Sequence, residues 1–308
     1  MSATSAIFSA IRRFRPLRDI LQARLAKDPN EIIRTIATVV EERKVDPVLR
    51  ALENSCTPLE FADALARAGA LARVSRKALS RVAVAKRLRE EAPETYQRLA
   101  VANDIALYRD PAVPVSGKCL LLLFPGRARV GIPLVSFVQF VPASRFDIVF
   151  LRDRSLLSFE AGIAGFARTL PELVARLGRD LDVTSYRRTA TLGASLGGLP
   201  ALRAGILLGS ERAIAMGGRF NWHVGRLLKG GRTIPAFDLL CDCGPRGRTR
   251  LIAAYATGHE QDRQDVARLE LTHRIERKPI ENADVHNITH FLVREGRYRA
   301  FLSEILDG

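Results

Sequence analysis

The spacing of apolar residues divides the chain into two parts. Residues 1 to about 110 show the three-to-four-residue period of helices, with apolar residues at 32, 33, 36, 39 and 40 in "EIIRTIATVVEER". The same period continues from Leu59 to Pro93, in an Ala-, Leu- and Arg-rich stretch that lacks a strand pattern. We therefore expect residues 1–110 to form an all-α N-terminal region. Helical hairpins are one arrangement that fits, although no repeat period is visible.

Strands and helices alternate after the segment "YRDPAVPVSGK", whose prolines Pro111 and Pro114 mark a boundary. We expect strands at 118–124, 146–151, 187–193, 212–218, 250–258 and 273–278. We expect helices at 132–140, 169–181, 197–209, 262–271 and 287–306, the second capped by Thr169. This alternation predicts an α/β domain over residues 111–308, with a mostly parallel sheet covered by helices on both faces.

The charge of the chain changes this picture little. The formal net charge is +15, which suits nucleic acid, an anionic membrane or an acidic partner, but only seven of the 48 basic residues are lysine. Such a ratio is as typical of a GC-rich genome as of a binding surface. Between Asp63 and Glu90 every charge is basic. A solvated helix face explains this run, and a docking face for an acidic protein or an anionic membrane surface is the alternative. Because the run has no aromatic residue to stack on bases, it argues against nucleic acid.

The four cysteines and the lack of targeting signals indicate a cytoplasmic protein. The cysteines are Cys56, Cys119, Cys241 and Cys243, too few for a disulfide framework, so we expect a reducing compartment. No apolar run approaches the roughly 18–20 residues of a membrane span. The N-terminus lacks the features of a secretory signal, although its Ser- and Arg-rich start would also suit a transit peptide.

No motif predicts a metal or a cofactor. Cys241 and Cys243 are separated by one residue, and this spacing, even with His223 or His259 nearby, is not the spacing typical of zinc ligands. The chain contains no phosphate-binding Gly-Lys-Ser/Thr motif, and no dinucleotide fingerprint follows the first strand of the α/β domain.

The pattern Gly-x-Ser-x-Gly at residues 193–197 lies between an expected strand and an expected helix. A sharp turn there would expose the Ser195 hydroxyl, and side chains at 193 and 197 would collide with the neighbouring strand and helix. The amide of Leu196 would face a substrate oxygen at the helix start, where the helix dipole favours negative charge. A tight turn without chemistry is the alternative.

Residues 118–306 resemble the α/β-hydrolase family, in which a serine at such a turn is followed by an acid after a later strand and by a histidine before the last helix. Asp262 comes just after the strand that ends near residue 257, and His286 precedes the final helix. The resemblance therefore implies a catalytic triad of Ser195, Asp262 and His286. Asp265 and His290 remain alternatives, although Asp265 is expected in the following helix and His290 away from the apolar face of the last one.

The resemblance also places an oxyanion hole and a cap. The second oxyanion donor, beside Leu196, would be the amide of Arg127 or alternatively of Gly126, in the loop "LLFPGRARVG". Many relatives have His-Gly in this loop, whereas this chain has Phe-Pro-Gly. Residues 218–248, which include the only tryptophan, occupy the usual position of a cap over the substrate.

We therefore expect a serine hydrolase that cleaves an ester or thioester through an acyl-enzyme on Ser195. An acyltransferase with the same triad is one alternative, and a non-catalytic binding protein with a helical docking module is another. The sequence defines neither the substrate, nor its acyl chain length, nor the oligomeric state.

Overall fold

A computed structural model describes residues 56–70, 91–126, 131–155, 157–220 and 247–307. They belong to two compact units, one of residues 1–95 with 134–136 and one of residues 96–133 with 137–308. In the first unit, α5 (Pro58–Ala70) is helical as expected. Thr57 and Glu60 form a capping box: Thr57 N donates to Glu60 Oε2 at 2.8 Å, and Glu60 N donates to Thr57 Oγ1 at 3.2 Å. The other helices expected before residue 91 lie outside the described residues.

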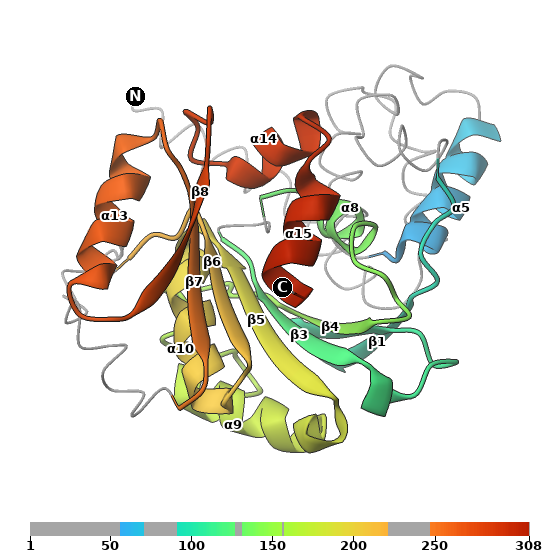
Figure 1. Ribbon diagram of the computed structural model, residues 1–308. Helices are drawn as coiled ribbons and strands as arrows, with labels where there is room; N and C mark the ends of the chain where they lie inside the picture. The colour runs from blue at the N-terminus through green and yellow to red at the C-terminus, as the bar shows by residue number, and fades with distance from the viewer. Residues whose placement is uncertain (1–55, 71–90, 127–130, 156, 221–246, 308) are drawn as a thin grey trace, which may run out of the picture. The chain divides into compact units, whose positions relative to one another are not determined.

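The second unit contains an eight-stranded sheet of order β1-β2-β4-β3-β5-β6-β7-β8 (Figure 1). The strands are β1 (Gln97–Ala102), β2 (Ile105–Arg109), β3 (Cys119–Phe124), β4 (Phe146–Leu151), β5 (Arg188–Ala194), β6 (Arg212–Met216), β7 (Arg250–Ala256) and β8 (Ile275–Ile280). Strands β3 to β8 are mutually parallel, and β1 and β2 join antiparallel at one edge. The expected mostly parallel sheet is confirmed.

The expectation of helices alone up to residue 110 is wrong over residues 97–109. These residues form the β1–β2 hairpin, in which Ala102 pairs with Ile105 and leaves a two-residue turn. Residues 105–108 are buried because β2 also pairs with β4. Residues 105–108 form a strand because they pair with a strand about 40 residues later in the chain. The local sequence pattern does not predict this distant pairing.

Helices cover both faces of the sheet, as expected (Figure 1). The helices α9 (Leu170–Asp180), α10 (Gly198–Leu208) and α13 (Glu260–Glu270) lie on one side, and α15 (Tyr298–Asp307) lies on the other. The Thr169 side chain accepts a hydrogen bond from Glu172 N and caps α9, which confirms the predicted start of that helix. A short helix, α8 (Leu134–Val138), falls within the range predicted for it.

The single last helix predicted over 287–306 is two helices in the structure. The first, α14 (Ile288–Arg294), ends before Gly296, whose φ is +69°, and α15 begins at Tyr298. A glycine in the left-handed region readily ends a helix. The apolar periodicity does not reveal this break, because it continues on both sides of Gly296.

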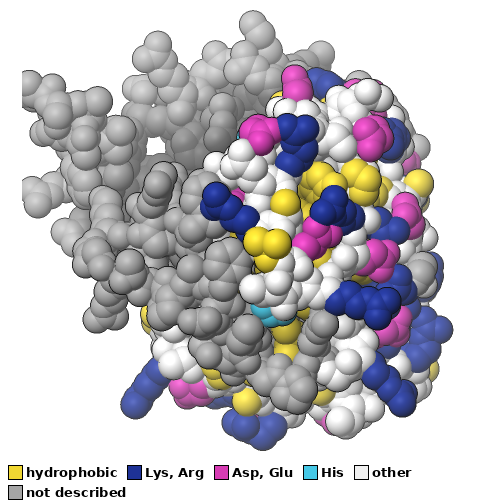
Figure 2. All heavy atoms as spheres, turned by 60° about the vertical axis from the view of Figure 1, so that its left-hand side comes forward, with side chains coloured by type: hydrophobic (Ala, Val, Ile, Leu, Met, Phe, Trp, Pro, Cys, Tyr) yellow, Lys and Arg dark blue, Asp and Glu magenta, His cyan; other side chains and the backbone are white. Residues whose placement is uncertain are grey.

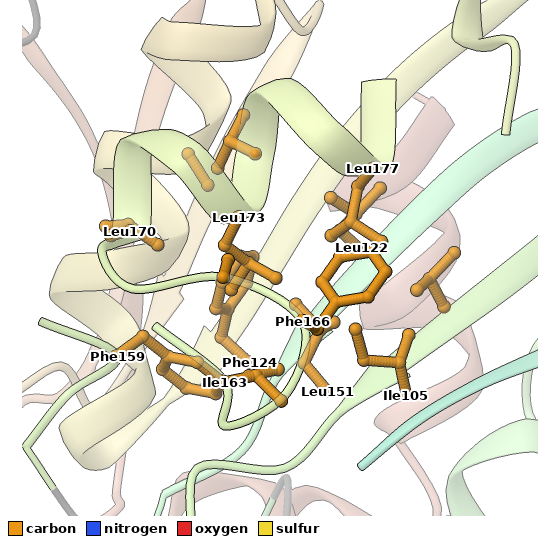
Figure 3. Close-up of a cluster of buried hydrophobic side chains, with 14 of the residues drawn as sticks. Ile105, Leu122, Phe124, Leu151, Phe159, Ile163, Phe166, Leu170, Leu173 and Leu177 are labelled. Atoms are coloured by element: carbon orange, nitrogen blue, oxygen red, sulfur yellow. The ribbon is translucent and has the colours of Figure 1, made fainter. Parts of the chain in front are cut away.

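The apolar core between the sheet and α9 is continuous. Leu122 and Phe124 of β3 point toward Leu170, Leu173 and Leu177 of α9 (Figure 3). Every residue of β3 is buried because both faces of the sheet are covered. This rigid layer holds the carboxyl ends of β3 and β5 side by side, next to the turn at Ser195.

Charges of both signs are interspersed on the face that Figure 2 turns forward. Ion pairs accompany this mixing: Lys278 Nζ on β8 lies 2.8 Å from Glu304 Oε1 and 3.2 Å from Glu276 Oε1. The net positive charge of the chain is therefore not gathered into a patch of one sign on the described part of this face. Among the helices that the structure describes, none combines the length and the apolar character that a membrane crossing requires.

Candidate active site

The chain turns sharply at Ser195, between β5 and α10. Strand β5 ends at Ala194, the 3-10 turn η3 (Ser195–Gly197) follows, and α10 begins at Gly198. The φ angle of Ser195 is +53°, in the left-handed region. A non-glycine residue held there costs on the order of 1–3 kcal/mol, and such strain is concentrated at functional sites. Ser195 is partly exposed, whereas Ala194 and Leu196 on either side are buried.

The two glycines of the motif give this turn the room it needs. A Cβ atom at Gly197 would lie 1.9 Å from the carbonyl oxygen of Phe124, at the end of β3. A Cβ atom at Gly193 would lie 1.9 Å from the carbonyl oxygen of Gly197. Any side chain at either position would therefore push the serine turn away from the central strands.

Three side chains far apart in the sequence form a chain of hydrogen bonds. His286 Nε2 lies 2.9 Å from Ser195 Oγ, and His286 Nδ1 lies 2.9 Å from Asp262 Oδ1. Because a carboxylate can only accept, the His286 proton is assigned to Nδ1, which leaves Nε2 free to accept from the serine hydroxyl. The arrangement can remove a proton from Ser195 while a buried carboxylate holds the imidazole.

Each of the three residues comes from a different connection after a strand. Ser195 follows β5, Asp262 follows β7 and His286 precedes α14. Asp262 lies in the first turn of α13, because this helix begins at Glu260, two residues before the predicted start. Parallel strands bring these connections to the same edge of the sheet, and this is the physical reason that the three residues meet.

The two alternative residues lie elsewhere. His290 is in α14 with an exposed side chain, and its backbone N–H donates to Asn287 Oδ1 at 3.1 Å. Asp265 is buried in α13, one turn beyond Asp262. The ring that contacts Ser195 is that of His286, and the carboxylate that contacts this ring is that of Asp262.

The structure describes part of the expected oxyanion hole. Leu196 lies in the middle of the turn into α10. Gly126 follows β3, whose last residue, Phe124, has its carbonyl oxygen where a Cβ atom of Gly197 would collide with it. Arg127 lies outside the described residues, as do Trp222 and most of the expected cap over 218–248. Where the chain is described again, Gly131 O accepts a hydrogen bond of 2.9 Å from Asn287 Nδ2. Asn287 therefore ties the end of the segment that was expected to carry the second oxyanion donor to the loop that carries His286.

Sequence reasoning missed two residues that shape this site. Gly217, after β6, has a φ of +55°, and a Cβ atom there would lie 2.8 Å from His286 O. His259 Nδ1 lies 3.0 Å from Asp262 Oδ1, so a second imidazole contacts the same carboxylate oxygen as His286. The double glycine at the end of the expected strand 212–218 was the sequence signal that could have indicated Gly217. The spacing of three residues between His259 and Asp262 was the signal that could have indicated His259.

His259, Asp262 and His286 are also of the residue types that bind metal ions. Within the described residues, they form the group of such residues whose ligand atoms all lie within 4.8 Å of one another. His286 Nδ1 forms a hydrogen bond of 2.9 Å with Oδ1, and His259 Nδ1 lies 3.0 Å from the same oxygen and 3.3 Å from Asp262 N. Cys241, Cys243 and His223, which were considered as zinc ligands, lie outside the described residues.

Comparisons with known proteins identify the fold. No protein-family model and no curated protein sequence matches this chain. Among solved structures it is similar to 2,6-dihydroxy-pseudo-oxynicotine hydrolase, with 15% identity over 94% of this chain and 88% of that chain and a TM-score of 0.51. It is also similar to dienelactone hydrolase from Anabaena variabilis (13% identity, 69% and 95% covered, TM-score 0.45). A third is FphF, a fluorophosphonate-binding serine hydrolase from Staphylococcus aureus (11%, 70% and 100%, 0.47). The chain has the α/β-hydrolase fold, which confirms the fold that the sequence resemblance implied.

Proposed function

We propose that this protein is a serine hydrolase that cleaves an ester or thioester through an acyl-enzyme on Ser195. The observation that carries the proposal is the unbroken hydrogen-bond chain from Ser195 Oγ through His286 to the buried Asp262. The left-handed backbone of Ser195 supports it, because strain held in place by a rigid sheet is typical of a residue with a chemical role.

The proposed reaction has two steps that share one base. In the first step, His286 Nε2 takes the proton of Ser195 as Oγ attacks the acyl carbon. The same proton then passes to the departing alcohol or thiol, and the acyl group remains on Ser195. In the second step, His286 takes a proton from water as the water oxygen attacks the acyl carbon. The bond between this carbon and Ser195 Oγ then breaks, the acid is released, and His286 returns the proton to Oγ. Asp262 holds the imidazole in orientation throughout and stabilises its positive charge.

The proposed oxyanion donors are the backbone amides of Leu196 and of Arg127, with Gly126 as the alternative to the latter. The oxygen of the tetrahedral intermediate would bind there, in line with the start of α10. The choice between water and another acyl acceptor depends on the residues over the substrate, and most of the cap segment lies outside the described residues. Acyl transfer and a purely binding role therefore stay as alternative predictions.

Partners and location also stay as predictions. Most of the basic run between Asp63 and Glu90 lies outside the described residues, so docking to an acidic protein or an anionic membrane follows from sequence alone. The expectation of a cytoplasmic protein rests on the few cysteines, of which Cys119 is a free thiol in the structure.

A fluorophosphonate probe tests the proposal directly. We expect the native protein to be labelled, Ser195→Ala to show no labelling, and His286→Ala to react at least about 10³-fold more slowly. His290→Ala is the matched control, because this histidine lies four residues further on with an exposed side chain, and it should react at the native rate. A folded native protein that is not labelled would refute the proposal. A series of nitrophenyl esters of increasing acyl length would then define the preferred substrate.

A further inference from the structure

The carboxylate of Asp262 is held in an unusual way. Its Oδ1 atom lies 2.9 Å from His286 Nδ1 and 3.0 Å from His259 Nδ1. Its Oδ2 atom is buried, and no hydrogen-bond donor within the described part of the chain contacts it. Within the described residues, the side chains in contact with this carboxylate are thus two imidazoles that approach the same oxygen.

His259 has a fixed position from which to reach that oxygen. It is the N-cap residue of α13, in the turn directly after β7. Its backbone N–H donates to Ala256 O at 3.2 Å, and the preceding Gly258 N donates to Ala283 O at 2.8 Å. The turn is thus tied both to β7 and to the loop before His286. The ring centroids of His259 and His286 lie 5.6 Å apart, and the Nδ1 atom of each ring approaches Asp262 Oδ1.

The ring nitrogen of His259 has two competing partners. Nδ1 lies 3.3 Å from the backbone N of Asp262, for which it would act as a helix cap, and 3.0 Å from Asp262 Oδ1. It can accept from the first only without a proton and donate to the second only with one. A lone pair facing the buried carboxylate would be repelled, and Asp262 N–H has another acceptor in His259 O at 3.1 Å. The protonated Nδ1, which donates to Oδ1, is therefore the favoured arrangement.

We propose that His259 is a positioning residue of the site: its Nδ1–H holds Asp262 Oδ1 in line with His286. The proposal rests on the proposed function, since the purpose of this hold is to keep the His286 ring directed at Ser195. Without His259, the partner left to the carboxylate among the described residues would be His286, which gains and loses a proton in each step. Rotation of the carboxylate would then lengthen the His286 hydrogen bond and turn the ring away from Ser195.

Two substitutions separate this role from helix capping. Serine is among the best N-cap residues, so His259→Ser keeps a cap for α13 but has no N–H at the position of Nδ1. Asparagine is an equally good cap, and its side-chain amide nitrogen can take the place of Nδ1 as a donor to Oδ1. If His259 served only as the N-cap of α13, both variants would have the stability and the activity of the native protein.

We expect thermal unfolding of both variants to stay close to that of the native protein. The labelling rate with a fluorophosphonate, and kcat on a nitrophenyl ester, should fall about tenfold or more in His259→Ser, because small misplacements of catalytic groups have effects of this size. His259→Asn should restore the rate to within about threefold of the native protein. KM should change little, because His259 contacts Asp262 and not the reacting centre. Native activity in His259→Ser, or no recovery in His259→Asn, would overturn the proposal.

A proton NMR readout tests the same idea without any activity. The His286 Nδ1 proton, identified by its loss in His286→Ala, should give a downfield resonance in the native protein and in His259→Asn. This resonance should be lost in His259→Ser. If the native protein fails to react with the probe, the proposed function is refuted. The resonance alone then tests whether His259 positions Asp262. Its absence from the native protein, or its persistence in His259→Ser, would overturn the role of His259.

Discussion

Gly217→Ala tests how closely the site is built, because Gly217 touches the backbone of His286. A Cβ atom at this position would lie 2.8 Å from His286 O and 3.5 Å from both His286 Cε1 and Asp262 Oδ2. An ordinary contact is about 3.4 Å or more, so His286 would have to move by roughly 0.6 Å. If the ring moved by that amount away from Ser195, the 2.9 Å hydrogen bond would reach about 3.5 Å, beyond an effective length.

The backbone of Gly217 adds a second cost that must be separated from the first. With a φ of +55°, alanine there is strained by about 1–2 kcal/mol. Gly209→Ala is the matched control, since Gly209 has a φ of +64° and a Cβ atom there would have no neighbour within 4 Å. Both variants should lose about 1–2 kcal/mol in the free energy of unfolding from this strain.

Activity should distinguish the two variants. We expect Gly209→Ala to retain the native kcat on a nitrophenyl ester, and Gly217→Ala to lose about 10- to 100-fold, because a displacement approaching 1 Å has effects of this order. Urea unfolding gives the stability of each variant, and initial rates give kcat. Equal activities in the two variants would refute the argument that Gly217 positions His286.

Two further predictions concern the opposite end of the sheet. Lys118 Nζ lies 2.8 Å from Asp147 Oδ1 with both side chains fully buried, and Asp147 Oδ2 also contacts Arg109 and Tyr186. Since Asp147 keeps these two partners, Lys118→Met should lower the free energy of unfolding by about 1.5–3 kcal/mol in urea. The double variant with Asp147→Asn should regain part of this loss, and a loss below about 1 kcal/mol in the single variant would contradict the reasoning. Burial raises the pKa of Cys119 to about 12, so its thiol stays protonated at pH 8. Iodoacetamide should therefore modify the Cys119 peptide in urea but not in the folded protein, as mass spectrometry would detect, and modification of the folded protein would count against its burial.

Long uniform patterns in the sequence predicted their elements well. Strand 146–151 has the bounds expected from its apolar residues, and 118–124 begins one residue later than expected. These strands are buried on both faces, so their positions are apolar apart from Asp147, and no other element suits so short a run. Helix α9 was also predictable, because Thr169 and Pro171 are local signals for its start.

The errors fell where distant contacts decide the local structure. The hairpin at 97–109 exists because β2 pairs with β4, and the break between α14 and α15 depends on a single backbone angle at Gly296. A periodic pattern averages over several residues, so it does not detect a single left-handed residue. A strand's partner can be far away in sequence, so local propensity does not identify it.

For the site, the sequence by itself determined which residue types were present and in which order. The turn chemistry of residues 193–197 and the order Ser195, Asp262, His286 followed from short-range patterns and from the family resemblance. Only the tertiary structure placed His286 Nε2 at 2.9 Å from Ser195 Oγ and a second imidazole, His259, on Asp262 Oδ1. Only the tertiary structure also showed Gly217 against the backbone of His286. The physical reason is that parallel strands bring loops from distant parts of the chain to one edge of the sheet, and contacts made there leave no periodic trace in the sequence.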